Sequence, residues 1–446
     1  MKIIFPPLYF VILMFCINIF LFSLPSFADQ PMMKISVGEA RTKKSIIAFP
    51  ALQLSSADAE GRLRIIRDIC MEDLAFSGLF DFLNPTAFIE NTTKAGISLG
   101  SFKMTDWSSI GAEFIMKGEG KLDSSHINLE IYLYSTHSGK QLLAKKYKAS
   151  IDSSRKLGHT LANDVMFALT GKRGPFTSKI AFVSDRTGKK EVYVMDYDGH
   201  NPVKVTSRFS HAMAPAWSPD GKQIVFTAIT RNKKNIRNHN LFLYNLSSGK
   251  ISMISNKSGI NSGATYKPNG KELALTMSFP GNPEIFLLDP SSKVAKRITN
   301  SYGLDVDPSF SPDGKQIAFV SDRSGRPMVY KMNSDGANIQ RLTFAGQYNA
   351  TPSWSPLGNK IAFAGWDQGK FDIFIMNSDG TSLERLTKNM GNNEDPDFAP
   401  DGYFIVYSSN RMGKKNLYIT NTDNTVHRRI TSDFGNAESP KWGPAD

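Results

Sequence analysis

After residue 172 the chain is dominated by short runs of β-branched and aromatic residues bounded by Gly, Pro, Asn or Asp. Examples are Ile317–Val320, Met328–Met332 and Ile373–Met376. Runs of this composition between turn residues are typical of short strands. Asp-Gly pairs such as Asp313-Gly314 supply the positive φ that tight turns need. The pattern predicts an all-β region of many short antiparallel strands.

A turn phrase close to Trp-Ser-Pro-Asp-Gly recurs through this region at a nearly fixed stride. Its prolines are Pro219, Pro268, Pro312, Pro356, Pro400 and Pro444. Successive prolines are 49, 44, 44, 44 and 44 residues apart. A unit of four strands every 40 to 50 residues, roughly, is the signature of a β-propeller blade. The repeat therefore predicts a six-bladed β-propeller.

The two ends of the repeat region are offset. The strand run Ile180–Val183 has no turn phrase before it, and the phrase at Trp442 has no strand after it. We infer that Pro440–Trp442 supplies the innermost strand of the blade that begins at Ile180. The C-terminal strand then closes the ring, which leaves no exposed sheet edge.

Residues 29–172 lack the repeat and mix helical and strand patterns. Apolar residues at helical spacing predict a helix over 56–77, with Ser56-Ala57-Asp58 as its cap and Gly78 as its stop. A second helix is predicted over 155–169. The predicted strands are 46–50, 114–118, 127–134 and 142–147. Together these elements predict an α/β domain over 29–172, followed by the propeller over 173–446.

The first 28 residues are of a different kind. Lys2 precedes a largely apolar stretch that ends near Leu24, and Ser26-Phe27-Ala28 offers a small-residue cleavage site. This arrangement predicts a secretory signal peptide over 1–28, cut after Ala28. An uncleaved membrane anchor is the alternative, and Pro6, Pro7 and Asn18 weaken it.

Charge and cysteine content narrow the class of partner. The formal net charge is +12, and most of the excess lies in residues 173–446. A basic surface can attract nucleic acid or an acidic membrane, but secretion argues against nucleic acid. After cleavage only Cys70 remains, so no intramolecular disulfide is available and packing must supply the stability.

Motifs that resemble catalytic or metal sites are present, but each lacks its required context. Gly96–Gly100 matches G-x-S-x-G without the flanking strand and helix that a nucleophile elbow needs. Asp196–Gly199 and Asp305–Asp307 lack the further oxygen ligands of a calcium loop. The histidines have no zinc-ligand spacing, and His159 is interpreted as a packed or capping residue. We therefore assign no catalytic residue, metal or cofactor.

Blade topology indicates a more promising surface. The inner strand of each blade runs toward its turn phrase, so the segment leading into it lies at the central channel, on the opposite face. The residues predicted to bind a partner at this mouth are His211, Met213, Asn261, Ser262, Asp305, Asp307, Asn349, Thr351, Glu394, Asp395 and Glu438. Acidic residues at the mouth and basic outer loops predict a protein-docking surface. The alternative is that the acids only line a solvated channel.

Three stretches carry a family resemblance. They are Asp73–Phe80, Leu169–Phe176 running into Lys179–Ser184, and the repeats ending in Trp-Ser-Pro-x-Gly. In this combination the chain resembles the TolB family of the bacterial Tol–Pal system over nearly the whole mature length. The second blade departs from the pattern, with Tyr266-Lys267 in the phrase and Ala264 in place of proline.

The resemblance implies a non-enzymatic periplasmic scaffold, monomeric, that supports outer-membrane integrity and constriction at cell division. It implies that the propeller mouth binds the lipoprotein Pal and that the mature N-terminus binds TolA. The residues implied for TolA binding are Asp29, Gln30, Met33, Lys34, Ile35, Ser36 and Val37. Lys34–Val37 alternates in polarity, so it could add as a strand to a partner's sheet edge.

Two other classes of protein remain open. One is a secreted enzyme built on a propeller, either a metal-dependent lyase or a module associated with a peptidase. A peptidase would need a hydrolase domain, for which 446 residues leave no room, whereas a lyase would carry stoichiometric metal. The other is an adhesin-like module, which would have no affinity for Pal.

Overall fold

The computed structural model describes residues 43–54, 61–91, 94–231 and 235–445. The predicted signal peptide, the segment 29–39 with its predicted TolA-binding residues, and the predicted cap Ser56–Asp58 lie outside these residues.

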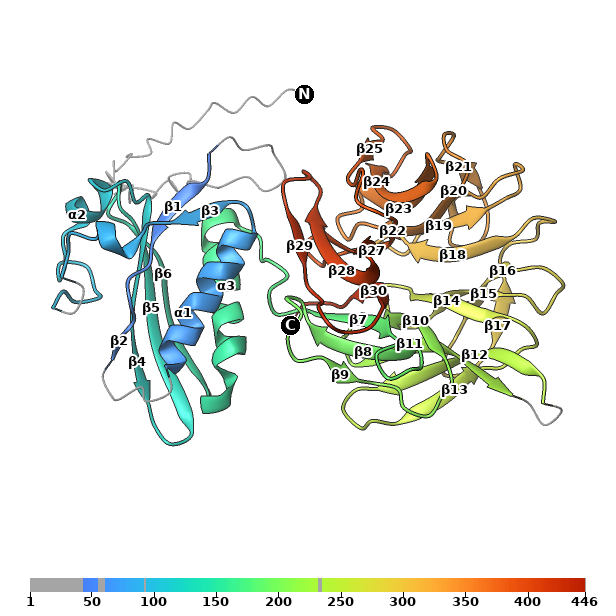
Figure 1. Cartoon of the computed structure of the whole chain (residues 1–446), viewed down its shortest axis with the longest axis horizontal. Helices are drawn as coiled ribbons and strands as arrows, with labels where there is room; N and C mark the ends of the chain where they lie inside the picture. The colour runs from blue at the N-terminus through green and yellow to red at the C-terminus, as the bar shows by residue number, and fades with distance from the viewer. Residues whose placement is uncertain (1–42, 55–60, 92–93, 232–234, 446) are drawn as a thin grey trace, which may run out of the picture. The chain divides into compact units, whose positions relative to one another are not determined.

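The first part of the described chain is a mixed sheet packed by helices. The strand order is β3-β1-β4-β5-β6, with β2 paired to β4. The strands are β1 (Ser45–Ala48), β2 (Gln53–Leu54), β3 (Phe80–Phe82), β4 (Phe114–Leu122), β5 (His126–Ser135) and β6 (Gln141–Ser150). The helices are α1 (Arg62–Phe76), α2 (Met104–Ser108) and α3 (Ser154–Thr170), with 3-10 turns at Pro85–Ala87 and Ile151–Ser153. Helices α1 and α3 lie side by side against the sheet (Figure 1).

The predicted helices and strands are present, and periodicity explains them, but α1 begins at Arg62 with Gly61 as its N-cap, later than the predicted start at residue 56. In α1 the apolar positions Leu63, Ile66 and Leu74 are buried, as helical spacing requires. Gly171 ends α3 with φ 74°, a left-handed conformation that glycine adopts without a Cβ penalty. In β5 every second residue is buried, so one face of the strand meets the helices.

The segment between β3 and β4 was not predicted to contain regular structure, yet it covers part of the sheet's other face. Trp107 of α2 is buried, and its Nε1 donates to Glu90 Oε2 at 2.9 Å. Lys117 of β4 is ion-paired with the same Glu90 and donates to Gly96 O at 3.0 Å. A buried ion pair therefore holds this segment on the sheet. The Gly96–Gly100 motif forms turns, with Ser98 exposed.

The rest of the described chain forms six four-stranded antiparallel sheets, numbered here as blades. Blade 1 contains β10 (Ala212–Trp217), β11 (Gln223–Arg231), β12 (Arg237–Asn245) and β13 (Ile251–Ser255). Blade 2 contains β14 (Asn261–Tyr266), β15 (Leu273–Met277), β16 (Glu284–Leu288) and β17 (Ala295–Arg297). Blade 3 contains β18 (Asp305–Phe310), β19 (Gln316–Ser321), β20 (Met328–Asn333) and β21 (Gln340–Arg341).

The remaining blades follow the same order from the inside outward. Blade 4 contains β22 (Asn349–Trp354), β23 (Lys360–Asp367), β24 (Lys370–Asn377) and β25 (Glu384–Arg385). Blade 5 contains β26 (Asn393–Phe398), β27 (Phe404–Met412), β28 (Lys414–Asn421) and β29 (His427–Arg429). Blade 6 contains β30 (Ala437–Trp442), β7 (Lys179–Ser184), β8 (Glu191–Asp196) and β9 (Val203–Lys204). The predicted fold class, an α/β domain followed by a six-bladed propeller, is confirmed.

Blade 6 closes the ring as predicted, because its inner strand comes from the other end of the chain. Strand β30 pairs with β7, with Lys441 opposite Ala181 and Trp442 opposite Ile180 (Figure 1). Trp442 Nε1 also donates to Ser178 Oγ at 2.7 Å. The last strand is therefore held by backbone pairing and by a buried indole.

Each inner strand begins earlier than the sequence predicted. The residues expected to form loops before the proline are the first half of the strand, and the pairing register shifts immediately before or at the proline. The residue before the proline, or before Ala264 in blade 2, has φ between 47° and 61° in every blade. Each inner strand therefore carries a bulge. These bulge residues are Ala214, Gly263, Asp307, Thr351, Asp395 and Ser439. Proline is tolerated because the inner strand is an edge strand, which needs no N–H on its channel side.

Candidate functional site: the propeller channel and its mouth

The inner strands surround a central cavity of about 310 Å³. Its first level of lining residues is the bulge residues named above. The second level, two residues further along the strands, is Ala216, Thr265, Ser309, Asp397 and Lys441, with Ser353 at the equivalent position of blade 4. A ring of aromatic residues follows and lines a second, adjoining pocket: Trp217, Tyr266, Phe310, Trp354, Phe398 and Trp442.

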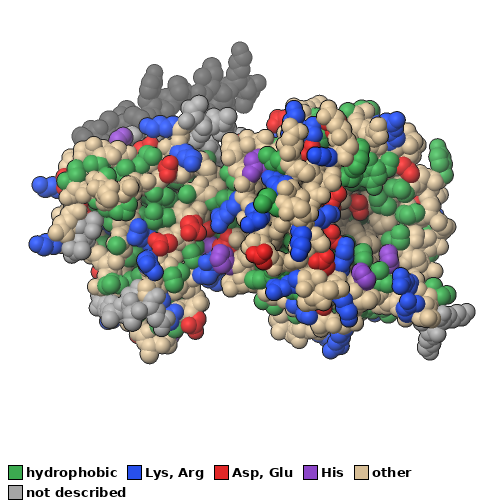
Figure 2. Space-filling model, in the orientation of Figure 1, with side chains coloured by type: hydrophobic (Ala, Val, Ile, Leu, Met, Phe, Trp, Pro, Cys, Tyr) green, Lys and Arg blue, Asp and Glu red, His purple; other side chains and the backbone are tan. Residues whose placement is uncertain are grey.

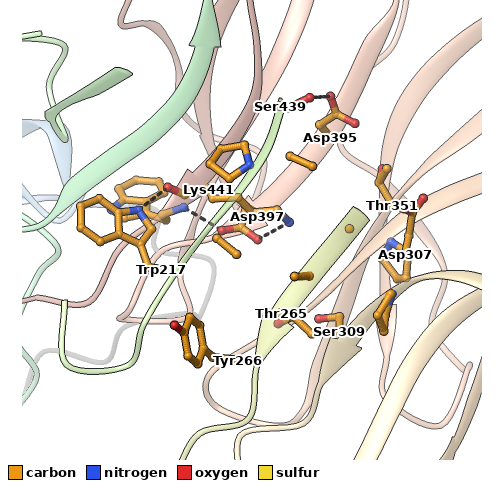
Figure 3. Close-up of a pocket in the computed structure, with 18 of the residues that line it drawn as sticks. Trp217, Thr265, Tyr266, Asp307, Ser309, Thr351, Asp395, Asp397, Ser439 and Lys441 are labelled. Carbon is orange, nitrogen blue, oxygen red and sulfur yellow. Dashed lines mark hydrogen bonds and ion pairs between the residues drawn. The ribbon is translucent and has the colours of Figure 1, made fainter. Parts of the chain in front are cut away.

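The bulge level is polar on one side only. Blades 3 to 6 contribute Asp307, Thr351, Asp395 and Ser439, whereas blades 1 and 2 contribute Ala214 and Gly263. Ser439 Oγ donates to Asp395 Oδ2 at 3.1 Å, as Figure 3 shows. A Cβ placed on Gly263 would lie 3.2 Å from Asp307 Oδ1, so the glycine leaves room for that carboxylate. The channel therefore presents a directional polar surface.

The second level holds an internal ion pair. Lys441 Nζ lies 3.1 Å from Asp397 Oδ1 (Figure 3). The same carboxylate accepts from Ser353 Oγ at 3.1 Å and from the backbone N of Trp442 at 2.7 Å. Asp397 therefore ties β30 to neighbouring strands, which gives it a structural role in ring closure.

The bulge-level carboxylates are less well compensated. Burial raises the pKa of Asp307 to about 6, and the nearby charge of Asp395 adds to the effect. Burial and the neighbouring Glu394 raise the pKa of Asp395. Burial would lower the pKa of Lys441, but the charges of Asp397, Asp395 and Asp307 raise it. The channel therefore favours the protonated forms of these side chains, and it favours binding of a positively charged group.

The raised pKa of Asp307 leads to a stability prediction. A carboxyl group whose folded pKa exceeds its unfolded value of about 3.9 binds its proton more tightly when folded. The free energy of unfolding should therefore fall as pH rises from about 4 to about 6, because the folded protein then has to hold Asp307 in its charged form, which burial disfavours. At pH 7 the Asp307→Asn variant is expected to have a higher melting temperature than the wild type. This difference in melting temperature should vanish near pH 4. Thermal melts across this pH range measure it, and a difference that does not vary with pH would contradict it.

Three predicted mouth residues are buried within their own blades. They occupy the first position of the inner strand, which is 0% exposed for Asn261 and Asp305 and 3% exposed for Asn349. Asp305 accepts two hydrogen bonds from Arg323 Nη2, at 2.9 and 2.8 Å. These side chains position their blades. The full burial of Asn261 and Asp305 does not favour direct contact with a partner, whereas Asn349 also lines a small pocket of its blade.

The predicted acidic and basic regions of the mouth bond to each other. Lys415 Nζ lies 2.5 Å from Glu394 Oε2 and 3.6 Å from Glu438 Oε2. Lys190 is also ion-paired with Glu438. Glu394 and Glu438 are therefore compensated locally, which leaves Asp307 and Asp395 as the acids that dominate the channel. Of the other predicted residues, Met213, Ser262 and Thr351 are half-buried, and His211 is exposed.

Exposed aromatic residues on the same face were not predicted. Tyr302 is 95% exposed and Phe344 is 75% exposed, in the loops that lead into β18 and β22. Aromatic residues are enriched at protein interfaces. In the sequence, the signal for each of these residues was a single aromatic within a polar loop. Basic side chains, by contrast, are scattered among other types over the face shown in Figure 2.

The other candidate sites from the sequence have structural explanations. Within the described ranges, no group of three His, Cys, Asp or Glu side chains is arranged to hold a metal ion. His159 is buried, and its Nδ1 lies 2.7 Å from Asp73 Oδ2. Asp196–Gly199 forms the turn between β8 and β9. No helix in the described part of the chain is long and apolar enough to cross a membrane.

Comparisons with known proteins agree with this fold. Residues 33–142 match the model of the TolB amino-terminal domain, and residues 167–446 match that of the TolB β-propeller domain. The chain is 34% identical over 218 residues to the Tol-Pal system protein TolB of Desulfosudis oleivorans, an alignment covering 49% of this chain and 48% of that protein. It is 38% identical over 171 residues to the protein of that name from Geobacter sulfurreducens, covering 38% and 39%.

These alignments mean that the chain spans about half or less of the length of the curated relatives it matches. The structural similarity is more extensive. A crystal structure of TolB from Acinetobacter baumannii shares 27% sequence identity and a TM-score of 0.78, and the match covers 92% of this chain and 99% of that one. Because the propeller match alone spans more than half of the sequence, the chain belongs to the TolB family.

Proposed function

We propose that the protein is a non-enzymatic periplasmic adaptor of the Tol–Pal system. It binds the lipoprotein Pal at the propeller mouth, and it binds TolA through the segment that begins at Asp29 after signal cleavage. By linking the two partners, it supports outer-membrane integrity and constriction at division. The names of the relatives support the system, and the observation that carries the docking site is the one-sided polar channel mouth.

The architecture of the mouth favours recognition over catalysis. The bulge is common to all six blades, so the scaffold is shared, whereas the side chains at the bulge differ from blade to blade. Variable side chains on a rigid scaffold are typical of binding surfaces. Holding a non-glycine residue at positive φ costs about 1–3 kcal/mol, and such strain is concentrated at functional sites. The exposed Tyr302 and Phe344 extend the surface outward from the channel.

The Pal site can be tested by neutralising the channel carboxylates without changing their shape. The double variant Asp307→Asn with Asp395→Asn is expected to weaken Pal binding about tenfold or more, because buried charges at an interface dominate its dissociation rate. Isothermal titration of the mature protein with the Pal periplasmic domain measures this. The matched control is Asp220→Asn with Asp313→Asn, which neutralises two acids of the turn phrases on the opposite face.

The two partner sites can be separated in the same system. Deleting residues 29–39 is expected to abolish capture of TolA while leaving the Pal titration unchanged. If the channel double variant is folded by circular dichroism and its affinity for Pal is unchanged, Pal does not bind at the channel mouth. If the deletion variant still captures TolA, TolA does not bind through the N-terminal segment.

A further inference from the structure

One blade departs from a motif that its neighbours share at the end of the second strand. Blade 3 has Ser321-Asp322-Arg323 and blade 5 has Ser409-Asn410-Arg411, whereas blade 4 has Gly365-Trp366-Asp367. The three are equivalent in register, because Ser321, Gly365 and Ser409 each lie opposite the first residue of the inner strand. At the position of two arginines, blade 4 therefore has a carboxylate.

The arginines of blades 3 and 5 make the same set of contacts. The Arg323 guanidinium lies 5.5 and 5.4 Å from the ring centroids of Phe319 and Tyr330, and it donates twice to Asp305. In blade 5 the Arg411 guanidinium lies 5.5 and 4.1 Å from the centroids of Tyr407 and Tyr418 and donates to Asn393 Oδ1 at 3.1 Å. Each guanidinium thus covers a cross-strand aromatic pair and bonds to the first residue of the inner strand.

In two other blades an aromatic residue of the chain itself covers the corresponding pair. Phe209 packs on Phe226 and Phe242 in blade 1, at 5.5 and 4.7 Å between centroids. Phe434 packs on Phe182 and Tyr193 in blade 6, at 5.4 and 5.1 Å. The fold therefore covers this position with its own side chains in blades 1, 3, 5 and 6.

Blade 4 has the aromatic pair but a cavity in place of the covering group. The rings of Phe363 and Phe374 stack at 5.7 Å and 16°. A pocket of about 140 Å³ lies against them and is also lined by Asn349, Trp366 and Asp367. A cavity of about 150 Å³ holds a benzene-sized group, so this pocket can accept the planar end of an arginine. Gly365 contributes to the shape, because a Cβ there would lie 2.9 Å from the Phe374 ring.

The hydrogen-bond acceptor that the missing arginine would use is also present. Asn349 occupies the position of Asp305 and Asn393, and its amide nitrogen donates to Ala345 O at 3.0 Å. Among the described residues, its Oδ1 accepts no hydrogen bond. The Arg385 guanidinium lies over Phe374, 5.6 Å from the ring centroid, but its N–H groups go to Asp372, to Asp367 Oδ2 and to Thr387 O, and it does not line the pocket.

We propose that the blade 4 pocket binds the guanidinium group of an arginine side chain from the protein that docks on the mouth face. Stacked aromatic faces attract a planar cation. Its N–H groups are accepted by the Asn349 amide oxygen and by Asp367 Oδ1, the carboxylate oxygen that Arg385 does not use. Trp366, Tyr348 and Phe371 form an aromatic cluster at the rim, where Phe371 packs edge-on against the other two rings. Arginine, tryptophan and tyrosine are enriched among interface hot spots, which lie in well-packed pockets. Guanidinium binding stands on this geometry, whereas the identity of its donor as Pal rests on the proposed function.

The pocket is tested first with a small probe on the full mature chain. N-acetyl-L-arginine amide is titrated into protein carrying 15N-labelled tryptophan, and the Trp366 indole signal, assigned with Trp366→Phe, is followed. We expect a saturable shift with this probe and none with N-acetyl-L-citrulline amide, which has the same shape without the charge. Asp367→Arg should abolish the shift, because the chain then supplies its own guanidinium as blades 3 and 5 do. Asp335→Arg, the same charge change on an exposed turn of the opposite face, should leave it unchanged.

A second arm tests the donor. Asp367→Arg is expected to weaken Pal binding about tenfold, with Asp335→Arg as the control. An equal response to the citrulline probe, no response to the arginine probe, or a wild-type response in Asp367→Arg would overturn the guanidinium site. Arginine-probe binding together with unchanged Pal affinity in Asp367→Arg would overturn the assignment to the docking protein. If the wild-type protein does not bind Pal but does respond to the arginine probe, the proposed function is overturned and the guanidinium site is not.

Discussion

Deleting residues 437–446 is expected to abolish cooperative folding of the propeller. This deletion removes β30, so β7 loses its inner partner and blade 6 keeps three strands. It also removes Lys441 and Trp442, which tie the strand to Asp397 of blade 5. The backbone groups of β7 that pair with β30 are then left without partners. Calorimetry and near-ultraviolet circular dichroism measure the effect, and a single wild-type transition in the deletion variant would contradict it.

A single substitution in the same strand gives a graded version of this test. Trp442 is 7% exposed and contributes to the core shared with Phe182 and Phe404. Trp442→Ala is expected to lower the free energy of unfolding by about 3–5 kcal/mol, the usual cost of emptying a buried aromatic site. Tyr302→Ala, at a residue 95% exposed, is the control and should change stability by less than about 0.5 kcal/mol.

Asp73→Ala is expected to be the most destabilising substitution where the helices meet the propeller. Asp73 of α1 is 2% exposed, and two donors converge on it. His159 Nδ1 of α3 lies 2.7 Å from Oδ2, and the Tyr197 hydroxyl, just after β8, donates to Oδ1. Removing the carboxylate leaves both donors buried without an acceptor. Breaking a buried pair in this way costs about 3–5 kcal/mol, which urea unfolding can measure.

Two variants separate the contributions to this cluster. Asp73→Asn keeps the shape and one acceptor, so we expect a smaller loss than for Asp73→Ala. Tyr197→Phe removes one hydrogen bond and should cost about 1 kcal/mol. The double variant Asp73→Ala with Tyr197→Phe should be less destabilised than the sum, because the two residues share a bond. A loss below about 1 kcal/mol for Asp73→Ala would show that the cluster does not hold the helices to the propeller.

Much of the fold could be predicted from the sequence because its signals are local. Turn phrases need proline and glycine at fixed offsets, so the stride of Pro312 and Pro356 reports one blade per repeat. The offset between Ile180 and Trp442 predicted closure for the same reason. The helices α1 and α3 follow from apolar spacing and from the glycines that end them. The segment held by Glu90 and Lys117 was missed, because one buried ion pair leaves no periodic pattern.

The candidate site was only partly predictable, because burial at the mouth depends on strand pairing. Asp305 and Asp307 are two residues apart and looked equivalent as mouth acids. The bulge separates them: Asp305 is buried against Arg323, whereas Asp307 lines the channel near Asp395. Glu394 looked like an uncompensated acid until the fold brought Lys415 to it. Neither pairing is local in the sequence, so no local pattern encodes it.

The sequence by itself determined the number of blades, the closure of the ring and the face that carries the variable residues. Only the tertiary structure decided which side chains reach that face, and it alone revealed the blade 4 pocket. The physical reason is that turns and periodicity follow from the conformational preferences of neighbouring residues. A bulge, a compensated charge or a cavity depends instead on side chains that meet across strands and blades. Asp367 is one letter in the sequence, and its significance appears only beside Arg323 and Arg411 in the equivalent places of the neighbouring blades.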